Sequence, residues 1–107
     1  MIVRGSLACL LLAGMLGPAA AQDAAAGRAK AAICAVCHGL QGVAVAIDAP
    51  HLAGQPAQYM VQQLRACRGG ARRHEVMSLM AKPLSDADID DLAAWFASLK
   101  ISVQTAP

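Results

Sequence analysis

Hydrophobic positions recur at helical spacing in the middle of the chain. Met60, Leu64 and Cys67 follow one another at intervals of four and three residues, which predicts the apolar face of an amphipathic helix. Pro56 suits the first position of such a helix, and the Gly69-Gly70 pair marks its end. We therefore expect a helix that starts at Pro56 and stops at these two glycines.

A second amphipathic helix is predicted near the C-terminal end. Ser85, with Asp88 three positions later, forms an acidic variant of the capping box, and Asp86 adds a favourable charge to the first turn. Trp95 flanks the apolar stripe. The stripe itself has helical spacing and consists of Ile89, Leu92, Ala93, Phe96 and Leu99.

Residues 23–50 combine an Ala-rich segment with an irregular one. Asp23–Ile33 favours a helix that runs directly into Cys34, and His38-Gly39 should end it. Leu40–Pro50 keeps no helical period and is expected to be a loop, unusually poor in polar residues. No stretch alternates with a period of two for long enough to build a sheet. The predicted fold class is all-α, with three to four short helices.

The N-terminal residues have the pattern of a secretory signal peptide. Arg4 precedes an apolar run from about Leu7 to Leu16, and small residues follow up to Ala21. This order is typical of exported proteins, and a core of about ten apolar residues is shorter than the roughly twenty of a membrane span. We expect a signal peptide at 1–21, cleavage after Ala21, and a single periplasmic domain at 22–107.

The expected mature region is small and nearly neutral, which narrows the function classes. Removal of Arg4 lowers the basic residues from 9 to 8, against 7 acidic ones, and a net charge near +1 gives no support for nucleic-acid binding. One Trp, one Tyr and one Phe make a thin core at a size where a core alone is only marginally stable. A covalent cross-link or a cofactor is therefore expected.

The stretch Cys34-Ala35-Val36-Cys37-His38 carries the candidate chemistry. With Cys67, the mature region holds three cysteines, an odd number that disulfides alone do not explain. A thioredoxin-type redox pair would need a strand before the motif, and the pattern shows none. Cys34, Cys37, Cys67 and His74 are of residue types that can bind zinc. The spacing of seven residues between Cys67 and His74 is, however, unusual for a zinc site.

C-x-x-C-H is also the attachment signature for c-type haem. Cys34 and Cys37 would form thioether bonds to the porphyrin, and His38 would be the proximal iron ligand. Export agrees with this interpretation, because bacteria attach haem outside the cytoplasm. A covalent haem would also supply the apolar bulk that the sequence lacks. We therefore expect one haem c, bound through Cys34 and Cys37.

The second axial position has several candidate ligands in the sequence. Met60 lies on a predicted apolar stripe and is expected in the core, while His51 and His74 are expected at the surface. Met77 and Met80 lie in the connection before Pro83, where the chain can fold over the open face of a haem. The residue pattern alone leaves both methionines open.

Three stretches carry a resemblance to a known family. They are, in order, "CAVCHGLQG", "APHLAGQPAQYMVQQL" and "VMSLMAKPLSDADIDDLAAWFASLK". In these motifs the chain resembles the class I c-type cytochromes, most closely the short bacterial type that also occurs as each half of two-haem periplasmic cytochromes. The match covers nearly all of residues 22–107 and implies the small cytochrome c fold around one haem.

The resemblance also implies residue roles. Cys34 and Cys37 match the haem-linking cysteines and His38 the proximal ligand, and Pro50 matches the proline whose carbonyl accepts a hydrogen bond from that histidine. Met77, seven residues before the leucine of "LSD", matches the distal ligand, with Met80 as the second choice. The cofactor-binding set is therefore Cys34, Cys37, His38, Pro50 and Met77, with His38 and Met77 on the metal. Gly27 and Trp95 match the positions where the first and last helices cross.

An iron with both axial positions filled predicts electron transfer rather than enzymatic turnover. We expect a periplasmic carrier that docks transiently on redox partner proteins, with no nucleic-acid partner and with membrane contact only through membrane-bound redox partners. A haem subunit of a larger dehydrogenase or oxidase complex is the alternative. A haem enzyme or gas sensor with a labile distal ligand is a weaker one. The apolar loop at 40–50 predicts either tight packing, which we favour, or a docking surface.

Overall fold

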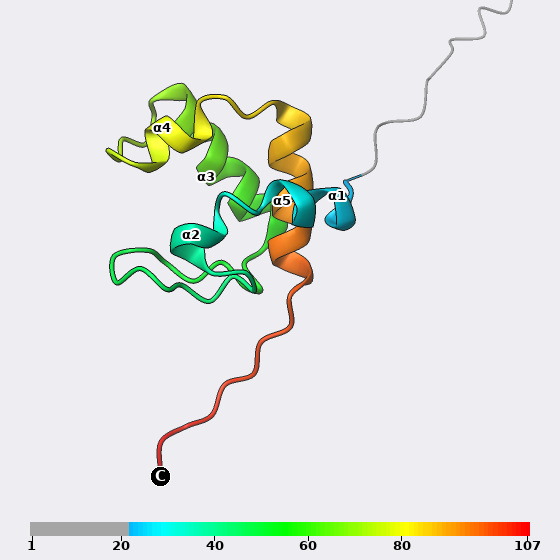
Figure 1. The fold of residues 1–107 in the computed structure, drawn as a ribbon, viewed down its shortest axis with the longest axis vertical. Coiled ribbons are helices and arrows are strands. Elements are labelled where there is room, and N and C mark those ends of the chain that lie inside the picture. Colours follow the sequence, from blue (N-terminus) through cyan, green and yellow to red (C-terminus); the bar gives the residue numbers. More distant parts are fainter. Residues whose placement is uncertain (1–21) are drawn as a thin grey trace, which may run out of the picture.

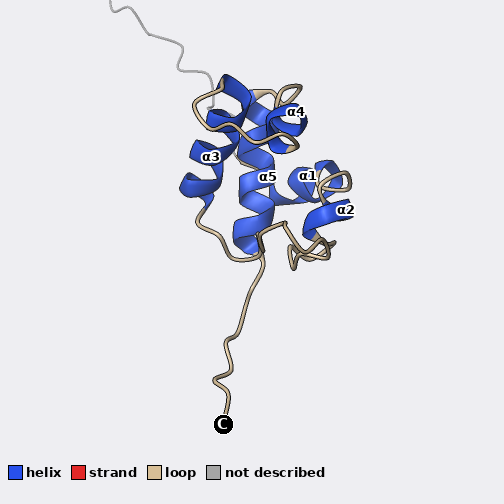
Figure 2. Ribbon diagram, turned by 90° about the vertical axis from the view of Figure 1, so that its left-hand side faces the viewer, coloured by secondary structure: helices blue, strands red, loops and turns tan. Residues whose placement is uncertain are grey.

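The computed structural model describes residues 22–107, and the predicted signal peptide lies outside this range. The described chain contains five helices and no strand, arranged as Figures 1 and 2 show. This confirms the all-α class. In chain order the helices are α1 (Ala24–Lys30), α2 (Ala35–His38), α3 (Ala57–Gly69), α4 (Met77–Ala81) and α5 (Asp86–Ser98).

The first and last helices cross at a glycine. A β-carbon at Gly27 would overlap the backbone carbonyl of Asp91 and would lie 2.9 Å from Cβ of Trp95, so only glycine allows this approach. Arg28 lies over the Trp95 ring, with its guanidinium carbon 5.5 Å from the ring centroid. The crossing expected at Gly27 and Trp95 is present in the structure.

Ion pairs also stabilise this crossing. The Lys30 ammonium lies 2.9 Å from an Asp88 carboxylate oxygen and 2.7 Å from one of Asp91. The backbone N–H of Asp23 donates to the Asp91 carboxylate at 3.0 Å. The Ser85 backbone N–H and the Lys30 ammonium hydrogen-bond the Asp88 carboxylate and lower its pKa to about 2. Both ends of α1, the N-cap Asp23 and the last residue Lys30, are thereby tied to the first two turns of α5.

The hydrophobic core lies between α1, α3 and α5. Ala31, Met60, Leu92, Ala93 and Phe96 form one buried cluster, and Leu64, Trp95 and Leu99 pack against it partly exposed. Buried Cys67 and Ile89 complete the two predicted stripes. Both amphipathic predictions are therefore confirmed, and Met60 and Cys67 are core residues as expected.

The helix ends follow the predicted signals, with one difference at the start of α3. Ser85 and Asp88 form a reciprocal capping box at the start of α5, as predicted, and Gly70 ends α3 in the left-handed conformation at φ 87°. Pro56 is the N-cap of α3 and not its first residue, so this helix begins at Ala57, one residue later than expected.

The N-terminal helix is shorter than the sequence predicts. It ends at Lys30, and a turn separates it from α2. Helix propensity does not encode this break, which divides the residues that pack on α5 from those of the C-x-x-C-H motif. Among residues 22–107 no helix combines the length and the apolar character needed to cross a bilayer.

Candidate functional site

His38 ends α2 with its ring buried and its orientation fixed. Only 7% of its surface is exposed, and Nδ1 lies 2.8 Å from the backbone carbonyl oxygen of Pro50. A carbonyl can only accept, so Nδ1 carries the proton and donates it to Pro50. Nε2 then keeps its lone pair, as required of a metal-ligating imidazole.

The loop that brings Pro50 to His38 is held by backbone hydrogen bonds. The N–H groups of Val45 and Ala46 donate to the carbonyl of Cys37 at 2.9 and 3.1 Å. Those of Leu52 and Ala53 donate to the carbonyl of Gly42 at 2.7 and 3.0 Å. Gly42 has φ 71°, a backbone conformation that favours glycine. The loop is therefore closed onto α2 across its base.

The two cysteines of the motif lie at opposite ends of one helical turn. Cys34 is the N-cap of α2 and Cys37 its third residue, and both are half-buried with free thiols. Burial raises the pKa of the Cys34 thiol. Two thiols three residues apart, with neither in a disulfide, are available for bonding to one rigid group.

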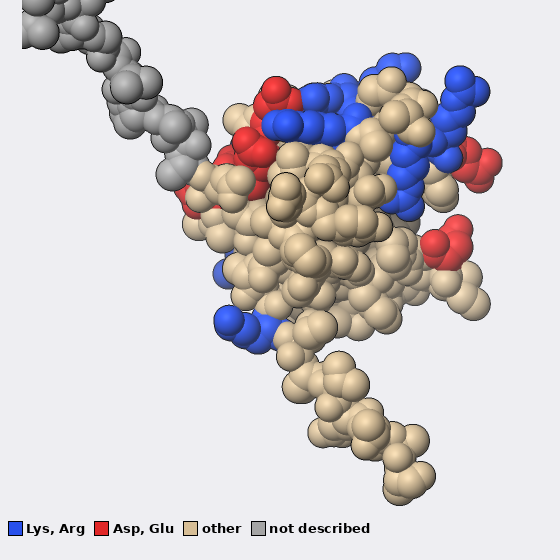
Figure 3. Space-filling model, turned by 180° about the vertical axis from the view of Figure 1, so that it is seen from behind, with Lys and Arg blue, Asp and Glu red and all other residues tan. Residues whose placement is uncertain are grey.

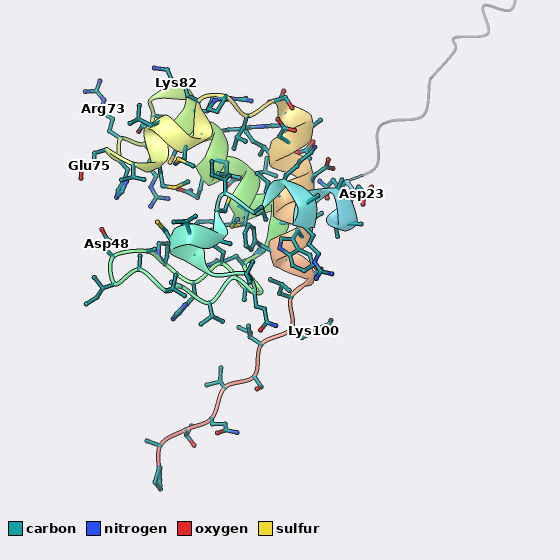
Figure 4. All side chains as sticks on the ribbon, viewed as in Figure 1. Asp23, Asp48, Arg73, Glu75, Lys82 and Lys100 are labelled. Atoms are coloured by element: carbon teal, nitrogen blue, oxygen red, sulfur yellow. The ribbon has the colours of Figure 1, made fainter. Side chains whose placement is uncertain are left out.

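Met77 is the first residue of α4 and Met80 its fourth. The connection expected before Pro83 therefore contains a short helix, a local ordering that the sequence analysis missed. Both methionines are half-buried, so burial does not distinguish them. In Figures 1 and 2, α4 lies above α2 on one side of α5. Figure 4 shows sulfur atoms gathered on this side, which α2, α3 and α4 share.

The other candidate ligands lie where the sequence predicts. His51 and His74 are exposed, and Met60 and Cys67 are buried in the core. Within the described range no group of three or more His, Cys, Asp or Glu side chains is placed to hold a metal ion. In this part of the chain, Cys34, Cys37, Cys67 and His74 therefore do not come together as a zinc site.

The apolar loop differs from the expectation of tight packing. Leu40, Val45 and Ile47 are exposed, with 81%, 71% and 105% of their reference surface accessible. Because the loop closes on itself through backbone bonds, these side chains are not needed to hold it together. The prediction of a tightly packed loop is wrong for these three residues.

The residues of this region fit an iron porphyrin. The paired free thiols can form the two thioether bonds, and the Nε2 of His38 can ligate the iron. Met77 and Met80 offer thioether sulfurs from α4. The small number of large side chains in the core agrees with a fold completed by a bulky apolar group.

Two further residues contact the segment around α4 in ways that the sequence does not predict. Nδ1 of His74 accepts the N–H groups of Val76 and Met77, and the guanidinium of Arg68 donates to the Leu84 carbonyl.

Comparison with known proteins agrees with this geometry. A family model described as cytochrome c matches residues 24–100. The chain is 47% identical to "cytochrome c4" of Pseudomonas aeruginosa over 91% of its length and 49% of the relative's. It is 46% identical to a "thiosulfate dehydrogenase electron acceptor" of Thiomonas intermedia, over 88% of this chain and 44% of the relative.

A solved structure gives the same result for the fold. The crystal structure of reduced recombinant cytochrome c4 from Pseudomonas stutzeri superposes with a TM-score of 0.72 at 41% sequence identity. The match covers 81% of this chain and 50% of the solved chain. The chain thus spans about half the length of these relatives.

Proposed function

The chain belongs to the cytochrome c family, whose members carry haem joined to a cysteine pair, and on that premise we propose that it is a one-electron carrier. Cys34 and Cys37 would hold the haem, and His38 and Met77 would ligate its iron. The single observation that carries the proposal is the hydrogen bond of 2.8 Å from Nδ1 of His38 to the carbonyl oxygen of Pro50. This bond fixes the ring orientation and leaves Nε2 unprotonated, as a proximal ligand to iron requires.

The residues around the site serve binding and orientation. Pro50 fixes the tautomer and the ring orientation of His38, and α4 carries Met77 at its first position. The bound haem supplies the one-electron couple between Fe(II) and Fe(III). If His38 and Met77 both ligated the iron, no open position would remain for a substrate, and the protein would contribute ligand choice, a low-dielectric surrounding and a docking surface.

The test is the oxidised absorption spectrum of three purified holo-proteins: wild type, Met77→Ala and Met80→Ala. The weak long-wavelength band of a thioether-ligated ferric haem should be present in the wild type and in Met80→Ala and absent from Met77→Ala. Met80 is the matched control because it lies on the same short helix with similar burial. A band that disappears only in Met80→Ala would reassign the distal ligand. A wild type without covalent haem would contradict the whole proposal.

An acidic redox partner is supported by the charges around α4. Figure 3 shows basic side chains gathered at the end of the molecule formed by α3 and α4, and Figure 4 shows Arg73 and Lys82 extending outward there. Arg65 and Arg68 face Asp86 and Asp90 in ion pairs.

In the described chain Arg73 and Lys82 make no ion pair, so their charge is available to steer an acidic partner. Replacing Arg72 and Arg73 together by Ala should flatten the salt dependence of the bimolecular electron-transfer rate. An unchanged slope would contradict this steering role.

A permanent haem subunit of a larger complex is the second candidate. The name of the Thiomonas intermedia relative, an electron acceptor of thiosulfate dehydrogenase, favours it. Co-purification from native extract at high salt distinguishes the two, since a transient carrier should elute alone. Either role agrees with export, and the mature protein should then begin at Gln22 when its N-terminus is sequenced.

A further inference from the structure

His74 is exposed and lies outside every helix, yet it makes several hydrogen bonds with the start of α4. Its Nδ1 accepts the backbone N–H groups of Val76 and Met77, both at 3.2 Å. Its own backbone N–H donates to Oγ of Ser78 at 3.0 Å, and its carbonyl accepts the N–H of Ser78 at 2.9 Å. Both the side chain and the backbone of one residue are therefore bonded to the first turn of this helix.

These contacts supply what a short helix lacks. The first N–H groups of a helix have no acceptor within it, and Val76, at the N-cap of α4, provides no side-chain bond. In most helices Ser, Thr, Asp or Asn fills this role, whereas here an imidazole does. A helix of five residues is also far too short to be stable alone. Its position therefore depends on the contacts at its ends and on its buried residue, Ala81.

We infer that His74 is the positioning residue for the distal methionine: its Nδ1 caps α4 and thereby fixes the backbone of Met77 toward the haem. This inference rests on the proposed function, which makes Met77 an axial ligand. His74 itself touches neither haem nor iron and acts through the backbone N–H of Met77. The pattern that signals it in the sequence is a histidine three residues before the ligand and a serine directly after the ligand.

The chain offers a matched control on the opposite side of the site. His51 is also exposed, and its Nδ1 accepts one backbone N–H, that of Ala44, at 2.8 Å. It lies in the loop that serves His38 and has no bond to α4. A substitution of His51 therefore removes the same kind of side-chain acceptor without touching the distal segment.

The experiment compares His74→Ala, His74→Asn and His51→Ala with the wild type as ferric holo-proteins titrated with imidazole. Imidazole competes with the methionine, so its apparent affinity rises with the fraction of molecules whose distal segment is open. Loss of one cap should raise that affinity about fivefold in His74→Ala. An asparagine carbonyl can accept the same N–H groups, so His74→Asn should regain most of the wild-type value. His51→Ala should match the wild type.

A second readout does not depend on which methionine binds the iron. Hydrogen exchange of the Val76 and Met77 amides in the reduced holo-protein should be faster in His74→Ala and near normal in His74→Asn. Wild-type exchange and wild-type imidazole affinity in His74→Ala would overturn the inference. So would an asparagine variant as defective as the alanine one. If the Met77→Ala spectrum keeps the thioether band, the ligand assignment fails independently, while the exchange data still decide whether His74 caps α4.

Discussion

The segments that present His38 and Met77 differ in the range of their hydrogen bonds. The loop after α2 makes backbone hydrogen bonds to the carbonyl of Cys37 in that helix and to the carbonyl of Gly42 within the loop itself. It also reaches α5, where the N–H of Gly54 donates to the carbonyl of Phe96 at 2.9 Å. It also accepts the bond from His38. The proximal side is therefore joined to distant parts of the chain mainly through the backbone.

The distal segment, residues 70–84, is held mostly by contacts within itself. The backbone bonds of α4 and the cap from His74 all join residues close in sequence. Its ties to α3 are few and include the N–H of Arg72 donating to the carbonyl of Ala66 at 3.1 Å, and the guanidinium of Arg68 donating to the carbonyl of Leu84 at 3.0 Å. Ala81 is the one residue of α4 that is fully buried.

This difference indicates which side of the site should open first. Segments with few non-local bonds open locally at a lower free energy than the global unfolding of the protein. The histidine side should therefore stay closed under conditions in which the methionine side opens. Under the proposed function, the covalent attachment and the proximal ligand would stay constant, and changes in distal ligation would come from the small segment around α4.

The largest effect is expected from Gly39→Ala, which should disturb the proximal loop at its first residue. Gly39 has φ 80° and ψ 153°, a region open essentially to glycine, and a β-carbon there would lie 3.0 Å from the carbonyl carbon of Val43. We expect the free energy of unfolding to fall by about 3 kcal/mol, measured by urea denaturation of the holo-protein.

Gly69→Ala is the matched control for that substitution. Gly69 is the last residue of α3, and a β-carbon there would meet nothing within 4 Å. Alanine is the better helix former, so this variant should be as stable as the wild type or more stable by up to about 1 kcal/mol. Equal losses for Gly39→Ala and Gly69→Ala would show that the proximal loop does not constrain the fold as described.

A smaller effect is expected from Arg68→Ala on the distal side. This guanidinium donates to the Leu84 carbonyl and, at 2.7 Å, to the Asp86 carboxylate. Its hydrogen bond to Asp86 and its positive charge lower the pKa of that carboxyl. Loss of both contacts should cost about 1 kcal/mol and should appear mainly as faster amide exchange in residues 77–84. Exchange in the loop around His38 should change less.

Arg65→Ala provides the comparison for Arg68→Ala. Arg65 reaches Asp86 and Asp90 only at 3.7 and 3.9 Å and is more exposed than Arg68. Exposed pairs of this kind contribute little, so stability should stay within about 0.5 kcal/mol of the wild type. If Arg65→Ala accelerated amide exchange in residues 77–84 as much as Arg68→Ala, the positive charge near Asp86, and not the bond from Arg68 to Leu84, would be what stabilises the distal segment.

The smallest expected effect concerns the crossing of α1 and α5. The pKa of Asp88 is lowered from 3.8 to about 2 by the Ser85 N–H and by Lys30. The ionised carboxylate therefore stabilises the fold above its ordinary pKa, and this contribution is lost as the pH falls toward 2. The melting temperature should drop in that interval, and Asp88→Asn should make the drop shallower. An identical pH dependence in both proteins would show that Asp88 contributes nothing to acid sensitivity.

Much of the fold could be predicted because its signals are local. The stripe around Met60 and the one around Leu92 each lie on a single helix, and the capping box of Ser85 and Asp88 spans four residues. The haem-binding motif is likewise contiguous, and together with the signal peptide, the all-α pattern and the small size it predicted the cofactor. The bond from His38 to Pro50 was implied only by resemblance, since no local pattern joins residues twelve positions apart.

The sequence by itself determined the helical class, the two apolar faces and the cysteine pair with its histidine, because periodicity and spacing are properties of neighbouring residues. Only the tertiary structure decided that the first helix stops at Lys30, that the connection before Pro83 contains α4, and that His74 caps it. These features depend on which surfaces meet and which N–H groups are left without acceptors once the helices are in place. Packing decides where these helices begin and end. Even the local bonds of His74 form only once a helix starts at Met77 and leaves the N–H groups of Val76 and Met77 without acceptors within it.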